Sequence, residues 1–418
     1  MRVLLLWPRV CWPPQTGLML RNYHLAHELA RRSAQVTCLS FADDQELASG
    51  AAGDLPPPPA EWCTEVVTIE RDAAYTPIKV LRGALGPTPI TVLNYTTSAM
   101  SHALARLLGA QPFDAVLVET STLGAYLPVI RAARNQPLAV CDWHNIDSEL
   151  MQRYSENAAN PARRLYARLT ARRMAEFERN VLRDYDGHIA VSERDAGGLR
   201  ARVPGARVAT IENGVDVNYH TDDKLKRAYD TWPLRNEGQR RRVIFVGSMD
   251  YHANVDAVIH FAEHAWPEIH RQRPEILFTI VGRKPAPEVQ ELAKRPGIEV
   301  TGTVPDVRPY YYEAVAQVVS LRVGGGSRLK ILEGMAAGVP VISTTLGAEG
   351  LDIADGVNIA LADTPRAMSQ AVFTIMDNEA HKRRLVSAAR DLVQRQYDWS
   401  ALGEALHRTL LAWRDDRA

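Results

Sequence analysis

Thirteen short apolar runs, separated by longer stretches with helical periodicity, constrain the fold of this chain more than any other feature. The runs cover residues 3–7, 36–41, 66–69, 115–118, 138–142, 188–192, 208–211, 243–247, 276–282, 298–301, 318–321, 339–343 and 358–362. Most of them are continuously apolar rather than alternating, which is typical of parallel strands buried on both faces. Strands that alternate with helices form right-handed βαβ units in doubly wound sheets. The sequence therefore predicts an α/β protein with Rossmann-like sheets.

The length and one charged stretch predict how the strands are divided. Thirteen strands are more than one open sheet comfortably holds, and 418 residues are enough for two domains. Residues 221–241 are dense in charge and lack apolar periodicity, so we expect a linker there. It would join an N-terminal Rossmann-like domain, residues 1–220, to a C-terminal one, residues 242–396. The remaining residues, 397–418, have leucines at helical spacing and predict an amphipathic helix.

Composition excludes several classes of protein. The chain has 49 Lys and Arg against 49 Asp and Glu, with 46% hydrophobic residues, which is typical of globular proteins and gives no support to a nucleic-acid binder. Its four cysteines are scattered and form no C-x-x-C pair, so neither a zinc site nor a disulfide framework is expected. No apolar run approaches the roughly 20 residues of a membrane span, and the N-terminus lacks the pattern of a secretory signal. The expected location is the cytoplasm.

A glycine-rich string is the most informative motif. Residues 323–343 read VGGGSRLKILEGMAAGVPVIS and follow a predicted strand. Glycines let the backbone approach a ligand, and the N-terminus of a helix favours an anion. Arg328 and Lys330 add two cations in the first turn, where the helix dipole disfavours them unless an anion such as a diphosphate is bound. Glu333 shares a face with Lys330, and its carboxylate can accept two hydroxyls of a ribose. The alternative is a plain glycine-rich loop with a solvated Lys–Glu pair.

Other strings appear in a fixed order along the chain. They are PPQTG at 13–17, IAVSE at 189–193, IENGVD at 211–216, VIFVG at 243–247, FTIVG at 278–282 and VTGTVPDV at 300–307. With the glycine-rich string, they make the chain resemble the retaining GT-B glycosyltransferases of glycosyltransferase family 4, also called glycosyl transferases group 1, over almost its whole length. The resemblance implies two Rossmann-like domains that face a cleft, with the C-terminal helix crossing back to the first domain. It also implies that the nucleotide sugar binds mainly to the C-terminal domain and the acceptor to the N-terminal one.

The resemblance assigns residues to the donor. Glu333 matches the second of two family glutamates, the one that holds the donor ribose. Gly325 stands where the family has the first glutamate, so here the backbone around Gly325 and Gly326 is left to contact the donor sugar. Gly17 matches the loop glycine near the diphosphate, and the backbone around Val304 would pair with the base.

The resemblance also identifies catalytic candidates. The family's Arg and Lys after the first strand of the second domain are absent from residues 247–254, which read GSMDYHAN. Arg328 and Lys330 are the expected substitutes, because a leaving diphosphate needs charge stabilisation. Its place at another strand end, rather than the resemblance, makes Arg283 a donor-binding candidate that would flank the base or the phosphates. His144 matches a family histidine close to the donor sugar and the acceptor, where it can bind a sugar hydroxyl or orient the attacking group. The alternatives are a surface salt bridge for Arg328, a solvated side chain for Arg283 and a structural histidine for His144.

The expected activity is transfer of a sugar from a nucleoside diphosphate sugar, of UDP or GDP type, to an acceptor hydroxyl, with retention and without metal, in glycan or glycoconjugate biosynthesis. No cofactor is expected. The only Asp-x-Asp string, residues 184–186, precedes a strand and is interpreted as a helix exit, and no residues have the spacing of metal ligands. Two alternatives stay open: a sugar-nucleotide epimerase of the same architecture, and a nucleotide-sugar-binding protein without transfer activity.

The acceptor can be a saccharide, a lipid-linked molecule or a small molecule. Residues 162–185 carry seven arginines among leucines, which predicts a basic amphipathic helix. Such a helix either has a solvated face or lies on an anionic leaflet. Peripheral contact with the inner face of a membrane is therefore the alternative to a purely cytoplasmic location.

Overall fold

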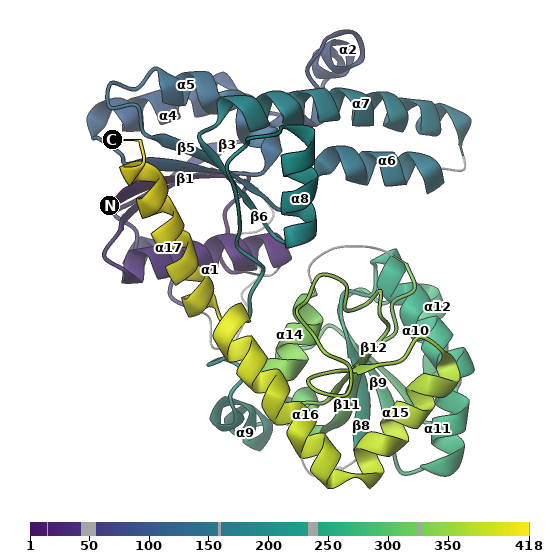
Figure 1. Ribbon diagram of the computed structural model, residues 1–418. Coiled ribbons are helices and arrows are strands. Elements are labelled where there is room, and N and C mark those ends of the chain that lie inside the picture. Colours follow the sequence, from purple (N-terminus) through teal and green to yellow (C-terminus); the bar gives the residue numbers. More distant parts are fainter. Residues whose placement is uncertain (15, 43–55, 158–159, 233–240, 324–327, 418) are drawn as a thin grey trace. The chain divides into compact units, whose positions relative to one another are not determined.

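The computed structural model describes residues 1–418 except 15, 43–55, 158–159, 233–240, 324–327 and 418. The chain forms two compact units. One contains Met1–Gly50, Leu55–Glu212 and Leu402–Ala418, and the other consists mainly of Asn213–Ala401. Each unit is a parallel sheet with helices packed on it (Figure 1). The predicted fold class, two doubly wound Rossmann-like domains, is confirmed.

The first sheet has seven strands in the order β3-β2-β1-β4-β5-β6-β7, and all neighbours are parallel. The strands are β1 (Arg2–Trp7), β2 (Gln35–Ala42), β3 (Glu65–Glu70), β4 (Ala115–Glu119), β5 (Leu138–Trp143), β6 (Gly187–Ala190) and β7 (Val208–Thr210). The strand order reverses between β1 and β4. Open sheets of this kind bind ligands at such a switch point, outside the carboxyl ends of the strands.

The helices of the first unit follow from local capping and from burial of one face. They are α1 (Gly17–Arg31), α2 (Pro77–Leu85), α3 (Ile90–Tyr95), α4 (Ser98–Ala110), α5 (Leu127–Arg131), α6 (Asp147–Asn157), α7 (Pro161–Asp184) and α8 (Glu193–Arg202), with short 3₁₀ turns at Pro59–Glu61 and Ser121–Tyr126. In α1, the Thr16 hydroxyl accepts a hydrogen bond from the Met19 amide and so satisfies one of the free N–H groups of the first turn. Alternate residues of β1 and β4, such as Leu4 and Val116, pack with leucines of α4 in a common core.

The second sheet has six parallel strands in the order β10-β9-β8-β11-β12-β13, so its switch point lies between β8 and β11. The strands are β8 (Arg242–Val246), β9 (Leu277–Val281), β10 (Ile298–Gly302), β11 (Ala314–Val319), β12 (Val341–Ser343) and β13 (Ala360–Leu361). The helices are α9 (Asp222–Asp230), α10 (His252–His264), α11 (Trp266–Gln272), α12 (Pro287–Glu291), α13 (Arg308–Glu313), α14 (Leu329–Ala336), α15 (Pro365–Asp377) and α16 (Glu379–Leu392), with a 3₁₀ turn at Leu292–Lys294 and a π-helical turn at Val393–Tyr397.

Two elements differ from the sequence prediction. Part of the expected linker 221–241 is helix α9, whose Leu225 and Tyr229 lie four residues apart and are buried against a small apolar cluster. Strand β11 begins and ends earlier than the predicted run 318–321, because the strand includes the buried polar side chain of Gln317. Helix α9 thus depends on two apolar residues in a polar segment, whereas β11 is an apolar strand interrupted by one buried polar residue.

Helix α17 (Trp399–Asp415) contributes its C-terminal part to the first unit. There Leu406 and Leu410 are fully buried. A Cβ atom at Gly187 would lie 2.4 Å from the Trp413 ring, so the indole occupies space that only a glycine leaves. The predicted amphipathic helix is present, with the leucine face buried.

Three further expectations concern membrane spans, cysteines and the Asp-x-Asp string. Among the residues that the structure describes, no helix has both the length and the apolar character needed to cross a bilayer. Cys11, Cys38, Cys63 and Cys141 are all free thiols. The string at residues 184–186 lies where α7 ends and just before β6, as interpreted from the sequence.

Candidate active site

Two glycine loops at the carboxyl edge of the second sheet touch through their backbones. Gly247 follows β8 and Gly282 follows β9, and a Cβ atom at Gly282 would lie 1.7 Å from the Gly247 carbonyl oxygen. The Met249 amide donates a 2.9 Å hydrogen bond to the Arg283 carbonyl oxygen, which fixes the two loops together. Glycine at position 282 is therefore what allows these two loops to pack so closely at the carboxyl edge of the sheet.

Lys330 brings a cation to these loops. It lies in the first turn of α14, and its Nζ atom donates a 2.6 Å hydrogen bond to Asn254 Oδ1 in the first turn of α10. The Asn254 amide nitrogen donates to the Ser248 carbonyl oxygen at 2.8 Å. Lys330 Nζ also lies 4.4 Å from the centre of the Phe245 ring, and a Cβ atom at Gly247 would be 3.0 Å from it. A cation thus stands beside the loop whose own sequence carries none.

Burial shifts the titration of Lys330 and Glu333 in opposite directions. The pKa of Lys330 is lowered to about 7, chiefly by desolvation, with Glu333 opposing the change and Arg328 contributing to it. Desolvation raises the pKa of Glu333, while Lys330 and a hydrogen bond from Tyr311 oppose that rise. The Tyr311 hydroxyl lies 3.4 Å from Glu333 Oε2. The site holds a lysine that is easily deprotonated when no anion is present.

Arg328 contacts Glu349. It is the residue before α14, its side chain is buried, and its Nε atom donates to the Glu349 carbonyl oxygen at 3.2 Å. Its Nη2 atom lies 3.6 Å from Glu349 Oε2. Arg328 thus forms a partly buried salt bridge with Glu349, and its expected role at a leaving diphosphate stays a prediction. Gly325 and Gly326 lie outside the described residues.

The other predicted donor residues lie at the ends of β9 and β10. Arg283 is exposed, and its Nε atom donates to the Ser248 hydroxyl at 3.1 Å, so it reaches the loop that follows β8. Val304 follows β10 and packs half-buried against an apolar cluster. Arg283 and Lys330 come from different elements and place positive charge on the same loop.

In the first unit, His144 is held by a carboxylate. It follows β5, and its Nε2 atom lies 2.9 Å from Oε2 of Glu119, the last residue of the neighbouring strand β4. Asp142 stands opposite Glu119 in the sheet and accepts two 3.0 Å hydrogen bonds from the Arg21 guanidinium. The Arg21 and Asp142 side chains are completely buried, and 9% of the His144 side chain is exposed. His144 lies at the carboxyl edge, as its position after a strand predicts.

Sequence reasoning missed Glu119. The pKa of Glu119 is raised to about 7, chiefly by burial and then by the charge of Asp142, while His144 and Arg21 oppose the rise. The sequence did contain a signal for it. Glu119 directly follows the apolar run 115–118, which indicates a carboxylate at the end of a strand. Its partner His144 is 25 residues away, so the pair becomes visible only once β4 and β5 are adjacent.

Among the residues that the structure describes, Glu119, Asp142 and His144 form a group that could hold a metal ion. One potential ligand atom from each lies within 4.8 Å of the others. However, Arg21 already binds both oxygens of Asp142, so a metal ion would compete with a buried guanidinium. The expectation of metal-independent chemistry stays a prediction.

Gly17 is the first residue of α1, directly after the Thr16 cap. It therefore lies in the turn whose free N–H groups favour an anion. Because α1 follows β1, this turn lies at the carboxyl edge beside the switch point of the first sheet.

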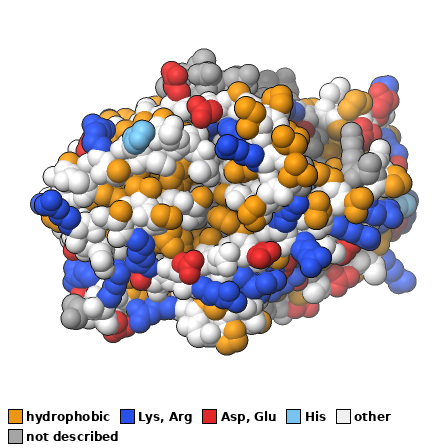
Figure 2. Space-filling model, turned by 90° about the horizontal axis from the view of Figure 1, so that it is seen from above, with side chains coloured by type: hydrophobic (Ala, Val, Ile, Leu, Met, Phe, Trp, Pro, Cys, Tyr) orange, Lys and Arg blue, Asp and Glu red, His pale blue; other side chains and the backbone are white. Residues whose placement is uncertain are grey.

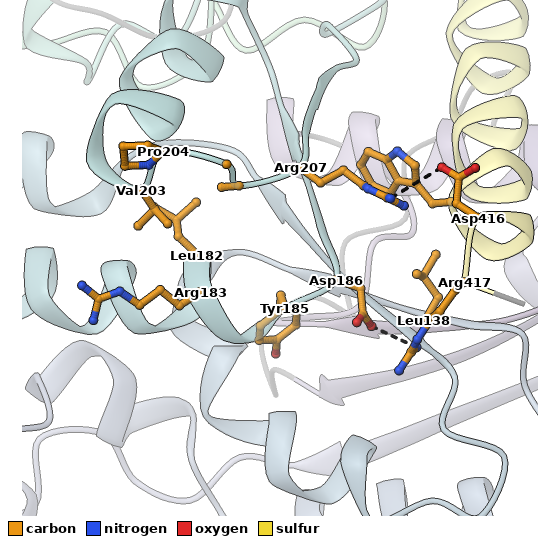
Figure 3. Close-up of a pocket in the computed structure, with 13 residues that line it drawn as sticks. Leu138, Leu182, Arg183, Tyr185, Asp186, Val203, Pro204, Arg207, Asp416 and Arg417 are labelled. Atoms are coloured by element: carbon orange, nitrogen blue, oxygen red, sulfur yellow. Dashed lines mark hydrogen bonds and ion pairs between the residues drawn. The ribbon is translucent and has the colours of Figure 1, made fainter.

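A cavity of about 490 Å³ lies at the opposite edge of the first sheet (Figure 3). Its lining residues include the first residue of β5, residues that precede β6 and β7, and residues at or just after the C-terminal end of α17. Ion pairs join Arg417 to Asp186 at 3.1 Å and Arg207 to Asp416 at 3.5 Å. Since doubly wound sheets bind ligands at the carboxyl edge, we do not assign this cavity to donor or acceptor.

Comparisons with known proteins agree with this architecture. Residues 17–219 match a family described as Glycosyltransferase Family 4, and residues 240–378 match one described as Glycosyl transferases group 1. A phosphatidyl-myo-inositol mannosyltransferase of Mycolicibacterium smegmatis is 29% identical over 238 residues, which are 54% of this chain and 58% of that protein. The match thus spans little more than half of that relative.

Solved structures share the fold over their whole length. Alr3699/HepE of Anabaena, solved in complex with UDP and glucose, has a TM-score of 0.63 at 14% identity and covers 99% of this chain and 100% of its own. The sucrose-phosphate synthase of Thermosynechococcus elongatus has a TM-score of 0.65 at 19% identity, and the match covers 99% of this chain and 100% of the synthase chain. At these identities the similarity establishes the fold.

Proposed function

Because the chain belongs to the glycosyltransferases that combine a family 4 domain with a group 1 domain, we propose that it transfers a sugar from a nucleoside diphosphate sugar to an acceptor hydroxyl. The observation that carries this proposal is the position of Lys330 against the Gly247 loop, which itself packs on the Gly282 loop, at the switch point of the second sheet. Glu333 lies on the same face of α14, where its carboxylate can bind the ribose. The diphosphate would then lie against the glycine loops.

The reaction that we propose retains the anomeric configuration and uses no metal ion. The acceptor oxygen bonds to the anomeric carbon on the face from which the diphosphate leaves, while the bond from that carbon to the phosphate oxygen breaks. The proton of the acceptor hydroxyl passes to the leaving diphosphate. Lys330 and Arg283 stabilise the negative charge that develops on the diphosphate.

The first unit would contribute His144. Its imidazole binds a hydroxyl of the donor sugar or of the acceptor, and Glu119 fixes the orientation of the ring through the 2.9 Å contact. Glu119 is therefore a positioning residue rather than a base. The first-turn amides of α1, including that of Gly17, provide a further place for the diphosphate.

The donor class that we propose is a UDP or GDP sugar. One relative is named for transferring mannose to phosphatidyl-myo-inositol, and one structure of the same fold was solved with UDP and glucose. The acceptor classes are a saccharide, a lipid-linked molecule or a small molecule. We assign the enzyme to the synthesis of polysaccharides or glycoconjugates.

The test is a turnover assay with purified protein, a panel of UDP and GDP sugars and candidate acceptors, with a chelator present. We expect diphosphate release that depends on the acceptor, and a product whose anomeric configuration, read by nuclear magnetic resonance, equals that of the donor. An isomerised donor with its diphosphate still attached would identify an epimerase. Donor binding without any release would identify a binding protein, and either result would overturn the proposal.

A further inference from the structure

Two cysteine side chains of the first unit touch without being bonded. Cys38 lies inside β2, opposite Val66 of β3, and Cys63 lies between the 3₁₀ turn Pro59–Glu61 and the start of β3. Their Sγ atoms are 3.3 Å apart. The two sulfur atoms would therefore have to approach by only about 1.3 Å to form a bond.

Backbone hydrogen bonds hold both cysteines in place. Cys38 is part of the parallel ladder of β1, β2 and β3. The Cys63 amide donates a 2.8 Å hydrogen bond to the Pro59 carbonyl oxygen, and the next amide, that of Thr64, donates to the Val36 carbonyl oxygen at 2.7 Å. The contact between the thiols is therefore built on fixed backbone, and groups held at reacting distance need little further ordering to react.

The two thiols differ in their exposure to solvent. Cys38 is completely buried, whereas Cys63 is half-buried. Burial raises the pKa of the Cys38 thiol well above its ordinary value, so Cys38 stays protonated near neutral pH. The thiolate is the nucleophilic form of cysteine. Cys63 is therefore the sulfur that an oxidant from solution reaches first, and Cys38 is the second thiol beside it.

We propose that Cys38 and Cys63 form an oxidation site, which hydrogen peroxide converts to a disulfide. The Cys63 thiolate attacks one peroxide oxygen, the O–O bond breaks, and the hydroxide that leaves takes up a proton to become water. This step gives a sulfenic acid on Cys63. The Cys38 sulfur then attacks the Cys63 sulfur, the S–O bond breaks, and the hydroxyl group leaves with the Cys38 proton as a second water. Two thiols are oxidised, and one peroxide is reduced to two waters.

The disulfide would fasten residues 56–63 to β2. This segment borders α1, because the Pro57 carbonyl oxygen accepts a 2.6 Å hydrogen bond from the Tyr23 hydroxyl. The Trp62 ring also packs against the rings of Tyr23 and His27, with centroid distances of 5.6 and 5.3 Å. The bond would join residues 25 positions apart, which restricts the unfolded chain and stabilises the folded one. The inference goes beyond the proposed function, because oxidation needs neither donor nor acceptor.

Hydrogen peroxide is the probe because it is small and uncharged. Figure 2 shows Lys and Arg side chains spread over one face of the molecule, and these would also attract an anionic oxidant such as oxidised glutathione. The full chain is treated with one equivalent of peroxide, denatured, and its free thiols are counted. We expect the count to fall from four to two and to return to four with dithiothreitol. Mass spectrometry should find the Cys38 peptide linked to the Cys63 peptide, and the melting temperature should rise by at least about 4 °C.

Three single variants test the assignment. Cys63→Ala should keep its three thiols under this treatment and show no rise in melting temperature. Cys38→Ala should stop at the sulfenic acid, which dimedone labels on Cys63, and if this variant does not fold, Cys63→Ala still decides. Cys141→Ala is the matched control, because Cys141 is also a completely buried strand residue of the first unit, and this variant should still lose two thiols.

A disulfide that includes Cys11 or Cys141, or one that joins two copies of the chain, would overturn the inference. Equal loss of thiols in Cys63→Ala and in the unaltered protein would also overturn it. Turnover of donor is measured separately on the reduced protein, so failure of the oxidation site is distinguishable from failure of the transferase proposal.

Discussion

Lys330 Nζ donates a 2.6 Å hydrogen bond to Asn254 Oδ1, and this contact ties the first turn of α14 to the first turn of α10. The N-terminus of each helix carries partial positive charge, and the lysine, when protonated, adds a further positive charge in a desolvated place. Burial lowers the pKa of Lys330 to about 7 for this reason. An anion bound here would relieve the repulsion, so the arrangement favours a diphosphate.

Lys330→Met should weaken nucleoside diphosphate binding at least about tenfold, because it removes the cation next to the glycine loops. Binding of the nucleoside without phosphates should change little. Isothermal titration calorimetry with the diphosphate and the nucleoside measures both values. Lys294→Met is the control, since Lys294 is exposed and paired with Glu291 in the same unit. Equal effects of the two substitutions would contradict the role of Lys330.

Diphosphate binding should take up a proton above neutral pH. The free protein loses the Lys330 proton as the pH rises through about 7, and a bound anion raises that pKa again. Affinity should therefore decrease as the pH rises above about 7, until the pKa of the complex is passed. Calorimetry in two buffers of different ionisation enthalpy measures the uptake. Lys330→Arg should abolish it, because guanidinium stays charged. The same uptake in this variant would assign the proton to another group.

Glu333→Ala should weaken nucleoside diphosphate binding more than His144→Ala does. Glu333 is proposed to hold the ribose in the ground state, whereas His144 is proposed to act on the transferred sugar. Glu333→Gln should also reduce the preference for ribose over 2′-deoxyribose, because an amide accepts fewer hydrogen bonds than a carboxylate. Competition binding of the two nucleotides gives the ratio. An unchanged ratio would remove Glu333 from the ribose site.

Glu119→Gln should change how stability depends on pH. The pKa of Glu119 is raised from 4.5 to about 7 in the folded protein. Between these two pH values Glu119 stays protonated in the folded state and is ionised in the unfolded state. The free energy of unfolding therefore decreases as the pH rises through that window. Above about pH 7, the free energy of unfolding of the variant should therefore exceed that of the unaltered protein by at most about 3 kcal/mol. Urea unfolding followed by circular dichroism at several pH values measures this. Glu176→Gln, at an exposed position of α7, should show no such gain. If both variants gained the same free energy of unfolding above pH 7, Glu119 would be excluded as the cause of the pH dependence.

The fold could be predicted from the sequence because its strands are continuous apolar runs. Thirteen such runs became thirteen strands in two sheets with the expected parallel pairing. The prediction was wrong where polar residues are buried inside an element, as with Gln317 in β11. It was also wrong where two apolar residues are enough to anchor a helix, as with Leu225 and Tyr229 in α9.

The candidate site was only partly predictable, because its side chains meet across long sequence distances. The position of Lys330 in the first turn of a helix followed from local pattern. Its partner Asn254 is 76 residues away, and Arg21 and Asp142 are 121 residues apart. Arg328 donates to the Glu349 carbonyl oxygen, 21 residues away and beyond β12, which the local pattern did not predict, and its expected place at the diphosphate stays a prediction. A local pattern therefore predicts on which helix or strand end a charged residue lies. It does not predict which distant residue that side chain contacts.

The most direct test of the central claim is a crystal structure of the protein with whichever of UDP, GDP and ADP binds most tightly. We expect a phosphate oxygen within hydrogen-bond distance of Lys330 Nζ, the diphosphate against the backbone of Gly247 and Gly282, and the ribose hydroxyls on the Glu333 carboxylate. A nucleotide bound at another place, with the bond from Lys330 to Asn254 unchanged and Glu333 without contact to the ribose, would contradict the account.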